Sequence, residues 1–487
     1  MTHPLSAFLD LVAADGDAAM LAQGNRLLTR QQMLALSGSL AQGLAPLLPA
    51  SGPGPAKVML ALPNSPEMVA LLPAIWSLGG VPMFFSSKAT ADQRARVIAR
   101  YSPDVVIDET TLPRLLGQKG EIGPVRPDGA QDASVVFTSG STGLPKGVVQ
   151  KGSTLSSGVG RVARTLGYGP QERILVPIPF AHDYGWGQML SGLVGGHALI
   201  LPERDILTDI AEAINLHRPT ILAGVPSLYS ALLFGISGFE RADTASLRLL
   251  TSTGSPFSPR LHDALRARIP DARILRNYGL TETYRCCCLL PEHGDRPSGS
   301  VGRPIEGVTI RIVDRDGVPV PHGEEGEVVH VGAGVFDRYL DDPAATAQAR
   351  RIVDGQPAVF TGDFGVLDHD GHLKLLGRRD RLVKSMDVRV NLNDVEEALS
   401  GFATVSACAV LSRDDPQNGI TLVAFCIPKN AATPRDIQRE ANRALPPYMR
   451  PRDVHCLETL PRTSVGKIDY PALKAMLSDL HPPISKT

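Results

Sequence analysis

The hydrophobic positions of the first half of the chain follow two alternating patterns. Short runs of aliphatic residues are typical of buried strands, and they lie at 57–62, 81–84 and 105–107. Longer segments between them have the spacing of amphipathic helices, at 65–78 and 91–101. Pro66 fits the first turn of the earlier helix, where a missing N–H is tolerated. Strands and helices that alternate in this way predict a parallel sheet with helices on both faces.

The same alternation continues on both sides of this region. Residues 5–50 have helical patterning, interrupted by a short strand pair at 19–22 and 25–28. After residue 150 the pattern predicts one helix, at 206–216, and strands at 173–177, 198–201, 221–225, 247–251 and 274–278. We therefore expect the α/β arrangement to extend to about residue 280.

From Gly302 the pattern changes twice. Strands joined by short turns are predicted at 309–313, 326–331 and 372–376, which indicates an antiparallel subdomain. After Arg381, the pattern predicts a small α+β domain with helices at 393–400 and 433–444 and strands at 405–411 and 422–427. A chain of 487 residues is too long for one hydrophobic core. We expect a large N-terminal domain over residues 1–379 and a small C-terminal domain over residues 380–487.

Composition narrows the class of protein. With 49 basic and 50 acidic residues, the chain gives no electrostatic reason to expect a nucleic-acid or membrane partner. It has no apolar run near the ~20 residues of a membrane helix, and its N-terminus does not resemble a signal peptide. The six cysteines include no Cys-x-x-Cys pair, so we expect a reducing, cytoplasmic location. Because adjacent strand residues point to opposite faces, Cys286, Cys287 and Cys288 are expected to be buried small residues rather than metal ligands.

A strand that ends at Phe137 leads into a stretch rich in glycine and hydroxyl residues, which Pro145-Lys146-Gly147 closes. Glycines allow tight turns, while hydroxyls, turned backbone amides and a lysine can surround an anion. The stretch predicts a polyphosphate-binding loop, with a flexible surface loop as the alternative. It is not a Walker loop, because Pro145 precedes the lysine and valines follow it, so we expect a hairpin. The candidate phosphate contacts are Thr138, Ser139, Gly140, Ser141, Thr142, Gly143 and Lys146.

A second candidate stretch, Asn277-Tyr278-Gly279-Leu280-Thr281-Glu282-Thr283, follows a predicted strand. Ligands bind beyond the carboxyl ends of strands in sheets of this kind. An aromatic side chain there can stack on a base, and a carboxylate can hold Mg²⁺.

These two stretches resemble the phosphate loop and the Tyr-Gly-x-Thr-Glu motif of the adenylate-forming superfamily. That superfamily comprises acyl- and aryl-CoA synthetases, peptide-synthetase adenylation domains and luciferases. Three further stretches are similar to its later motifs, in family order: 360–363 (Phe-Thr-Gly-Asp), 377–380 (Gly-Arg-Arg-Asp) and 462–469. The resemblance extends from about Ala19 to Leu473 and implies ATP and Mg²⁺ as cofactors.

The resemblance also implies roles for single residues. Tyr278 would pack on adenine, Asn277 would meet the amino edge of the base, and Gly279, Gly254, Ser255 and Pro256 would complete the adenine site. Asp363 and Arg378 would contact the ribose, and Arg389 a nucleotide phosphate, although a solvated charge cluster is the alternative for 378–381. The catalytic group would comprise Thr281 at the α-phosphate, Glu282 as the magnesium ligand, His182 in the acyl pocket, and Lys467 between the acid and the α-phosphate. Asp380 would be the hinge of a mobile C-terminal domain.

The segment 180–185 lies where this family builds its acyl pocket. Amino-acid-activating members carry an aspartate at the position of Ala181, so we expect a carboxylic acid without an α-amine. Arg285 follows the magnesium motif, and two interpretations are open. It either pairs with a second acid group on the substrate or forms an outward structural salt bridge.

By resemblance, the expected activity is ATP-dependent adenylation of a small carboxylic acid, followed by transfer to CoA or to a phosphopantetheine carrier protein. No fused carrier domain is expected, because nothing substantial follows Leu473, so a carrier acceptor would be a separate protein. Asp387 stands where the family has glycine beside the thiol path, which leaves a nitrogen nucleophile open as the acceptor. A nucleotide-binding regulator without activity is the remaining alternative, against which the presence of Glu282 and Lys467 weighs.

Overall fold

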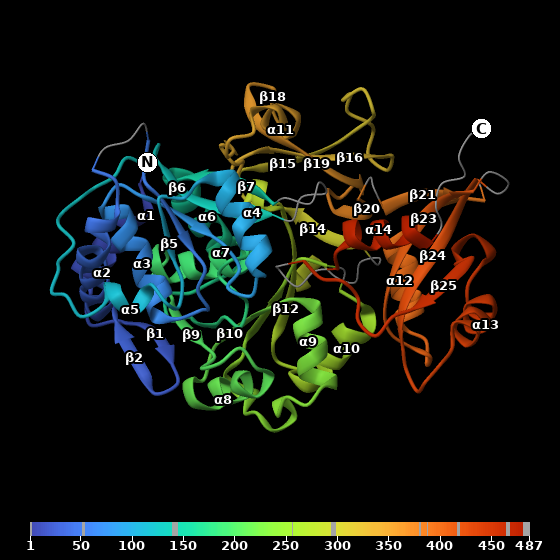
Figure 1. The fold of residues 1–487 in the computed structure, drawn as a ribbon, viewed down its shortest axis with the longest axis horizontal. Coiled ribbons are helices and arrows are strands. Elements are labelled where there is room, and N and C mark those ends of the chain that lie inside the picture. Colours follow the sequence, from blue (N-terminus) through green and yellow to red (C-terminus); the bar gives the residue numbers. More distant parts are fainter. Residues whose placement is uncertain are drawn as a thin grey trace. The chain divides into compact units, whose positions relative to one another are not determined.

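The computed structural model describes residues 2–50, 54–138, 145–255, 257–293, 299–378, 381–386, 388–415, 419–463 and 468–480. The chain forms two compact units. The first contains Met1–Thr138, Pro145–Thr361 and Val366–Leu375, and the second contains Gly362–Gly365 and Leu376–Thr487. Figure 1 draws the end of the chain, which belongs to the second unit, in orange and red. The predicted boundary at residues 379 and 380 lies outside the described residues and stays a prediction.

One sheet of the first unit has the strand order β17-β7-β6-β4-β3-β5. Strands β5, β3, β4 and β6 run parallel, and β7 and β17 continue antiparallel. The bounds of these strands are β3 Lys57–Leu60, β4 Val81–Phe84, β5 Val105–Ile107, β6 Asp132–Thr138, β7 Lys146–Lys151 and β17 Arg338–Tyr339. In the β6–β7 hairpin Thr138 pairs with Lys146, which confirms the hairpin expected around the glycine-rich stretch.

The larger sheet has the order β15-β16-β19-β20-β14-β13-β12-β11-β10-β8-β9-β1-β2, with β18 on the side of β19. Its parallel strands are β1 Ala19–Gln23, β9 Ala198–Leu201, β8 Arg173–Leu175, β10 Ile221–Gly224, β11 Leu249–Ser252 and β12 Arg273–Tyr278. The remaining strands are β2 Arg26–Thr29, β13 Cys287–Leu289, β14 Ser300–Pro304, β15 Val308–Val313, β16 Glu325–Gly332, β18 Arg350–Val353, β19 Gln356–Leu367 and β20 Leu373–Arg378. The predicted antiparallel strands thus continue the edge of the parallel block, through β13 and β14.

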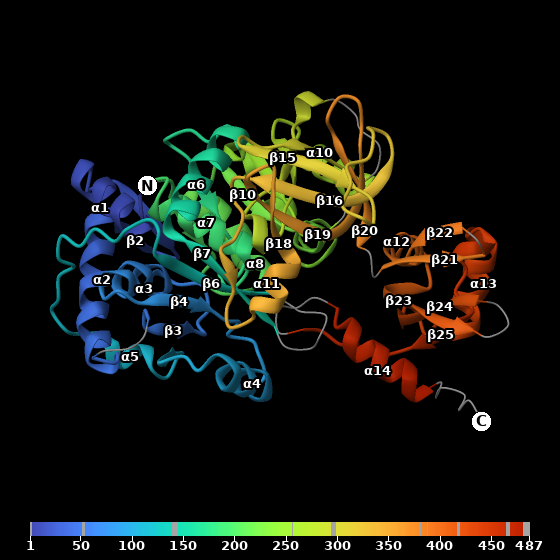
Figure 2. The ribbon, with the colours of Figure 1, turned by 90° about the horizontal axis from the view of Figure 1, so that it is seen from above.

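Helices cover both faces of the parallel block, as predicted. Alternate strand residues point to opposite faces, so Leu249 and Leu275 join the core with α3, α6 and α7, whereas Leu250 and Ile274 pack with α8, α9 and α10. Figure 2 shows α2 and α3 side by side near β3 and β4. The bounds are α1 Pro4–Ala14, α2 Arg30–Leu44, α3 Pro66–Ser77, α4 Ala91–Tyr101, α5 Leu112–Leu115, α6 Gly152–Leu166, α7 Asp183–Leu193, α8 Leu207–His217, α9 Pro226–Phe234, α10 Pro259–Arg268 and α11 Pro343–Ala349.

The second unit is α+β, as predicted. It has a β-hairpin of β21 Leu382–Ser385 with β22 Val388–Asn391, and a sheet of β23 Val405–Asp415, β24 Gly419–Pro428 and β25 Asp453–Cys456. Residues of β23 alternate between two cores. Val410 packs with helices α12 Leu392–Ser400 and α13 Pro434–Ala444, while Leu411 packs with α14 Tyr470–Leu480.

None of the helices in the described part of the chain is long and apolar enough to span a lipid bilayer. The cysteines at 286–288 are buried, and Cys287 and Cys288 lie in β13, in agreement with the sequence prediction.

Candidate active site

The candidate site lies where β11 and β12 end. These strands are parallel neighbours in which Ser252 pairs with Arg276, so their carboxyl ends meet at one edge of the sheet. The Asn277 amide donates to the Ser252 carbonyl at 3.3 Å and ties the two ends together. Gly254, with φ of +92°, and Ser255 follow β11, while Gly279 follows β12. Ligands of such sheets bind at this edge, as the sequence analysis assumed.

Two polar atoms at these strand ends have no hydrogen-bond partner in the described structure. Asn277 is 6% exposed and its Oδ1 is unpaired, and Ser252 is 3% exposed with an unpaired Oγ. A buried acceptor without a donor costs about 1–3 kcal/mol, and a ligand that supplies the donor is one way to remove that cost. The amino group of adenine is a donor of the kind that Asn277 Oδ1 lacks, and these residues therefore fit a nucleotide base.

Tyr278 is more enclosed than the sequence suggested. It is 8% exposed and packs in an apolar cluster with Cys286, Cys287 and Ile312. Its carbonyl accepts from the backbone N–H of Cys286 at 2.9 Å, where the chain turns back into β13. Only a small part of the ring surface is therefore open for the predicted stacking on adenine, which stays a prediction.

Thr281 and Glu282 lie in a 3₁₀ turn, Thr281–Thr283, that other elements hold in place. The Gln150 side chain in β7 donates to the Thr281 carbonyl at 3.1 Å. The Glu282 carbonyl accepts from the Phe336 N–H at 2.8 Å, and its carboxylate oxygen Oε1 accepts from the Tyr339 hydroxyl at 2.6 Å. The carboxylate is an oxygen ligand of the kind that Mg²⁺ prefers, so Glu282 fits the metal role predicted for it.

Tyr339 also links Glu282 to the predicted phosphate-loop lysine. The Lys146 ammonium lies 4.8 Å from the centre of the Tyr339 ring, a distance typical of a cation–π contact. Tyr339 is placed there because β17 pairs with β7, with Tyr339 opposite Val148. The structure therefore brings Lys146 to the ring, and Glu282 to the hydroxyl, of one aromatic side chain. Sequence reasoning missed Tyr339, because its only local signal is a short strand far from both motifs.

Gln150 is a second residue that the sequence analysis missed. It is 1% exposed, and its Oε1 accepts from Ser134 Oγ at 3.2 Å and from Trp186 Nε1 at 3.3 Å. Its amide donates to Thr281, as described above, so one side chain connects the hairpin β6–β7, helix α7 and the turn of Glu282. No local pattern marks a glutamine that follows two valines in a strand as the centre of such a network.

His182 immediately precedes α7. Its backbone N–H donates to the Pro179 carbonyl at 3.1 Å, and its carbonyl accepts from Trp186 N at 2.7 Å. The preceding segment is held by Asn64, whose side chain donates to the Ile178 carbonyl and accepts from Phe180 N–H, each at 2.8 Å. The segment that leads into α7 is therefore held by Asn64, a residue from a different part of the chain.

The first turn of α7 reaches the end of β11. The Tyr184 hydroxyl is hydrogen-bonded to Thr251 Oγ1. Burial raises the pKa of Tyr184 to about 12, although the nearby Arg285 guanidinium acts in the opposite direction. Tyr184 therefore stays a neutral phenol at physiological pH.

Arg285 lies inside the fold and not on its surface. Its side chain is buried, with 8% of the residue exposed, and the guanidinium carbon lies 5.2 Å from the centre of the Tyr184 ring. Among the described residues, no carboxylate forms an ion pair with it. The interpretation of Arg285 as an outward structural salt bridge is therefore wrong.

The second unit carries Asp363 and Arg378, the two predicted ribose contacts. Their charged atoms lie 3.7 Å apart, at side-chain exposures of 11% and 54%. Arg381, included in the alternative of a solvated charge cluster, is 7% exposed and bonds to Glu396, Asn393 and the Val410 carbonyl. The solvated-cluster alternative is wrong for Arg381.

Several predicted site residues lie outside the described residues. They are Ser139, Gly140, Ser141, Thr142, Gly143, Pro256, Asp380 and Lys467, and so does Asp387. Arg389 is described only as part of β22, without its side chain. The roles of all these residues stay predictions.

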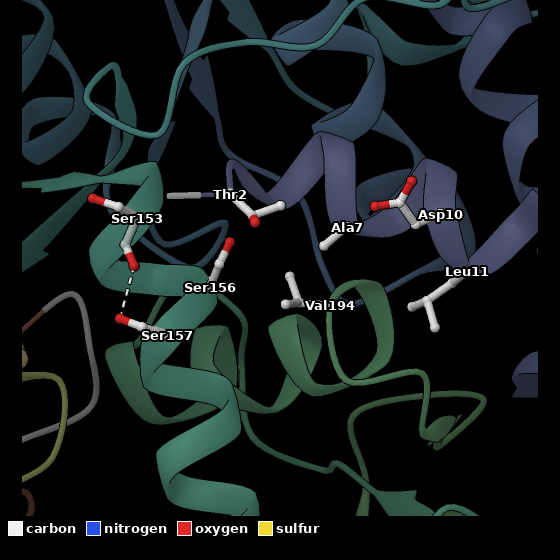
Figure 3. Close-up of a pocket in the computed structure, with 8 residues that line it drawn as sticks. All are labelled: Thr2, Ala7, Asp10, Leu11, Ser153, Ser156, Ser157 and Val194. Carbon is white, nitrogen blue, oxygen red and sulfur yellow. Dashed lines mark hydrogen bonds between the residues drawn. The ribbon is translucent and has the colours of Figure 1, made fainter.

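A cavity of about 510 Å³ in the first unit lies away from these residues (Figure 3). It is bounded by α1, the start of α6 and Val194, and three of its lining residues are the serines 153, 156 and 157. Ser157 donates to the Ser153 carbonyl at 2.7 Å within α6. None of the predicted site residues lines this cavity.

Comparison with known proteins identifies the family. The family model described as AMP-binding enzyme matches residues 9–340, and its C-terminal domain model matches residues 394–467. The chain belongs to the AMP-binding enzyme family. It is an AMP-forming ligase that uses ATP, as the sequence motifs predicted.

Three relatives show how far the likeness of this AMP-binding enzyme extends. 4-Coumarate:CoA ligase 1 from Petunia hybrida is 26% identical over 464 residues, which cover 86% of this chain and 84% of that protein. The amide bond synthetase McbA from Marinactinospora thermotolerans is 25% identical, with a TM-score of 0.79 over 97% of this chain and 99% of that chain. The o-succinylbenzoate CoA synthetase MenE from Bacillus subtilis shares the fold, with a TM-score of 0.85 at 24% identity over 96% of this chain and 98% of that chain.

Proposed function

We propose that this ligase converts a small carboxylic acid and ATP into an acyl-adenylate and pyrophosphate, and then transfers the acyl group to a thiol of CoA or of a carrier protein. The observation that carries the first step is the arrangement around Tyr339. Its hydroxyl binds Glu282 and its ring contacts Lys146, which joins the predicted metal ligand to the predicted phosphate loop. The likeness to a coumarate:CoA ligase supports a thiol as the first-choice acceptor.

In the first step, a carboxylate oxygen of the acid attacks the α-phosphorus, and the bond from that phosphorus to pyrophosphate breaks. Lys146 and the hydroxyls of the phosphate loop hold the leaving phosphates, and Thr281 contacts the α-phosphate. Lys467 approaches the same oxygens from the second unit and offsets the charge that grows on them. Mg²⁺ held by Glu282 would neutralise further phosphate charge when it is bound.

The nucleotide itself is held by the residues that the resemblance assigns. Asn277, Tyr278, Gly254, Ser255 and Pro256 surround the base, and the unpaired Oδ1 of Asn277 supports this assignment. Asp363 accepts from the ribose hydroxyls with Arg378 beside it, and Arg389 meets a phosphate. His182 lines the pocket that binds the acid substrate.

The experiment that tests the first step is ATP–pyrophosphate exchange with a panel of aliphatic and aromatic acids. We expect exchange with at least one acid, and we expect Lys467→Ala to abolish it while ATP still binds. Exchange that is unchanged in Lys467→Ala would reject the role of this lysine. ATP binding without exchange for any acid would favour the regulator without activity.

The second step needs a change of the groups that face the adenylate. We propose that the domain of residues 380–487 rotates about Asp380 between the two steps, so that the thiol reaches the site after Lys467 has left it. Pyrophosphate exchange does not identify the acceptor of the acyl group, so the acceptor needs an experiment of its own.

A nitrogen nucleophile is the second candidate acceptor. Asp387 places bulk and negative charge where a pantetheine arm would pass, and McbA, at 25% identity, is an amide bond synthetase. If this candidate holds, preformed adenylate mixed with wild-type protein gives little thioester with CoA but gives amide with an amine. Asp387→Gly should then increase thioester formation. Rapid thioester formation by the wild type would eliminate the candidate.

A further inference from the structure

Arg285 differs in its hydrogen bonding from Arg381, the other arginine that is buried among the described residues. Arg381, 7% exposed, is bonded to a carboxylate, an amide oxygen and a backbone carbonyl. Arg285 is equally buried, at 8%, yet its Nε has no hydrogen-bond partner and no carboxylate pairs with it among the described residues. Buried charges are normally paired, because an unpaired one loses its hydration without compensation.

The backbone at this point is arranged to turn Arg285 inward. Tyr284 has φ of 56° and ψ of −54°, and the N–H of Arg285 donates to the carbonyl of Thr283 at 2.6 Å. These values define a γ-turn of the rare form with positive φ, which is strained for any residue other than glycine. Strain of this kind persists where the surroundings enforce it and is concentrated at functional sites. The turn begins at Thr283, the residue after Glu282.

The groups around Arg285 include tyrosine phenols, and none of the described carboxylates forms an ion pair with its guanidinium. The guanidinium lies over the Tyr184 ring, and its charge also acts on the phenols of Tyr168 and Tyr284. Tyr184 connects this region to Thr251, the neighbour of Ser252, and it stands two residues after His182. Arg285 therefore contacts the side chain of α7 that joins the predicted acyl-pocket segment to the end of β11.

We infer that Arg285 is a specificity residue that binds a second carboxylate, at the end of the acid substrate remote from the carboxyl group that becomes adenylated. The planar guanidinium presents a fork of donors that matches a carboxylate in two hydrogen bonds. The tyrosines around it supply an amphipathic lining for the chain or ring between the two carboxylates. This inference rests on the proposed adenylation of a carboxylic acid and narrows the substrate to dicarboxylic acids.

The test compares acids of matched length that differ only in the second carboxylate: glutarate with pentanoate, adipate with hexanoate, and terephthalate with 4-methylbenzoate. ATP–pyrophosphate exchange is measured for the full-length wild type, for Arg285→Met, which keeps the length without the charge, and for Arg285→Lys. Arg164→Met is the control, because Arg164 lies on the surface of α6 and pairs with Glu306. Melting temperatures with and without each acid are recorded in parallel.

We expect the wild type to prefer the dicarboxylic acid of at least one pair, and Arg285→Met to reduce that preference by about 30-fold or more. The loss should be in KM for the dicarboxylic acid, while exchange with the monocarboxylic acid is retained. Arg285→Lys should keep part of the preference, and Arg164→Met all of it. Because an unpaired buried charge is removed, Arg285→Met should melt no lower than the wild type.

Three results would overturn the inference. The first is a wild type without a preference within any pair, and the second is a preference that survives in Arg285→Met. The third is an Arg285→Met variant that loses exchange with both acids of a pair equally and melts at a lower temperature, which indicates a structural role. If no acid supports exchange, the proposed function fails, and the melting temperatures then decide about Arg285. If a dicarboxylic acid raises the melting temperature of the wild type but not that of Arg285→Met, the carboxylate-binding site at Arg285 is supported. If no acid raises the melting temperature of the wild type, this binding site is rejected together with the proposed function.

Discussion

At the scale of single residues, the motif side chains depend on residues that belong to no motif. Glu282 and Lys146 are the chemically recognisable residues, but Tyr339 is the one that contacts both. Gln150 has a similar place beneath Thr281. If the motif residues have the roles proposed for them, Tyr339 and Gln150 set their orientation, and small errors in such an orientation are costly for the rate.

The first prediction concerns the Tyr339 hydroxyl. Tyr339→Phe keeps the ring over Lys146 but removes the hydrogen bond to the Glu282 carboxylate. A hydrogen bond to a charged group contributes about 1.5–3 kcal/mol, so we expect adenylate formation to slow by about 10-fold or more. The Mg²⁺ concentration for half-maximal rate should rise at the same time. Both are measured by pyrophosphate exchange at varied Mg²⁺, with ATP binding as the control.

This prediction separates a positioning role from a purely structural one. A structural role would lower the melting temperature of Tyr339→Phe and leave the Mg²⁺ dependence of the remaining activity unchanged. Wild-type rates together with a wild-type Mg²⁺ dependence would show that the Tyr339–Glu282 bond has no part in the reaction.

At the scale of elements, the position of α7 depends on a glycine, Gly185, at which a side chain would not fit. A Cβ on Gly185 would lie 2.2 Å from the Pro179 carbonyl oxygen, a distance that no side chain can occupy. A Cβ on Gly187 would meet its nearest neighbour, the Tyr284 hydroxyl, at 3.9 Å, which is an ordinary contact. Gly185 and Gly187, two of the three glycines of α7, therefore form a matched pair.

The second prediction follows from this pair. Gly185→Ala should push the start of α7 away from Pro179 and destabilise the protein by about 1–3 kcal/mol. It should also weaken acid binding, because His182 and Tyr184 move with the helix. Gly187→Ala should be neutral or stabilising by up to about 1 kcal/mol, since alanine favours a helix over glycine. Urea unfolding of the two variants checks the contrast, and equal stabilities would contradict the packing described for Gly185.

At the scale of the whole molecule, two buried histidines make the first unit sensitive to acid. His3, which accepts from Leu5 N–H at 3.2 Å at the start of α1, is 2% exposed, and His330 in β16 is fully buried. Burial lowers the pKa of each side chain from 6.5 to about 4. The unfolded chain therefore takes up protons between pH 6.5 and 4 that the folded protein does not accept.

The third prediction is the resulting dependence of stability on pH. The contribution of these histidines is complete above about pH 6.5 and is lost as the pH falls to about 4, by roughly 3 kcal/mol for each. Urea unfolding between pH 7.5 and 4, followed by the fluorescence of the buried Trp76 and Trp186, measures it. His330→Gln should flatten this decline, whereas His369→Gln should not, because His369 is exposed. A decline that begins only below pH 4 would contradict the prediction.

The elements were predictable because their causes are local. The alternation of aliphatic and polar residues defines strands and helices within a few residues, and the strands at 81–84 and 105–107 and the helix at 91–101 have the predicted bounds. The distribution of strands over two sheets was not predictable in this way. Strand order depends on contacts between distant segments, such as β1 with β9 or β17 with β7.

The sequence by itself determined the family and its ATP-dependent, AMP-forming activity, because these follow from contiguous motifs whose side chains act over short spacings. Only the tertiary structure decided that Tyr339 joins Lys146 to Glu282, that Gln150 supports Thr281, and that Arg285 is buried with no counter-charge among the described residues. Each of these depends on which distant segments pack together. The free energy of that packing is shared among residues throughout the chain and leaves no local pattern to be recognised.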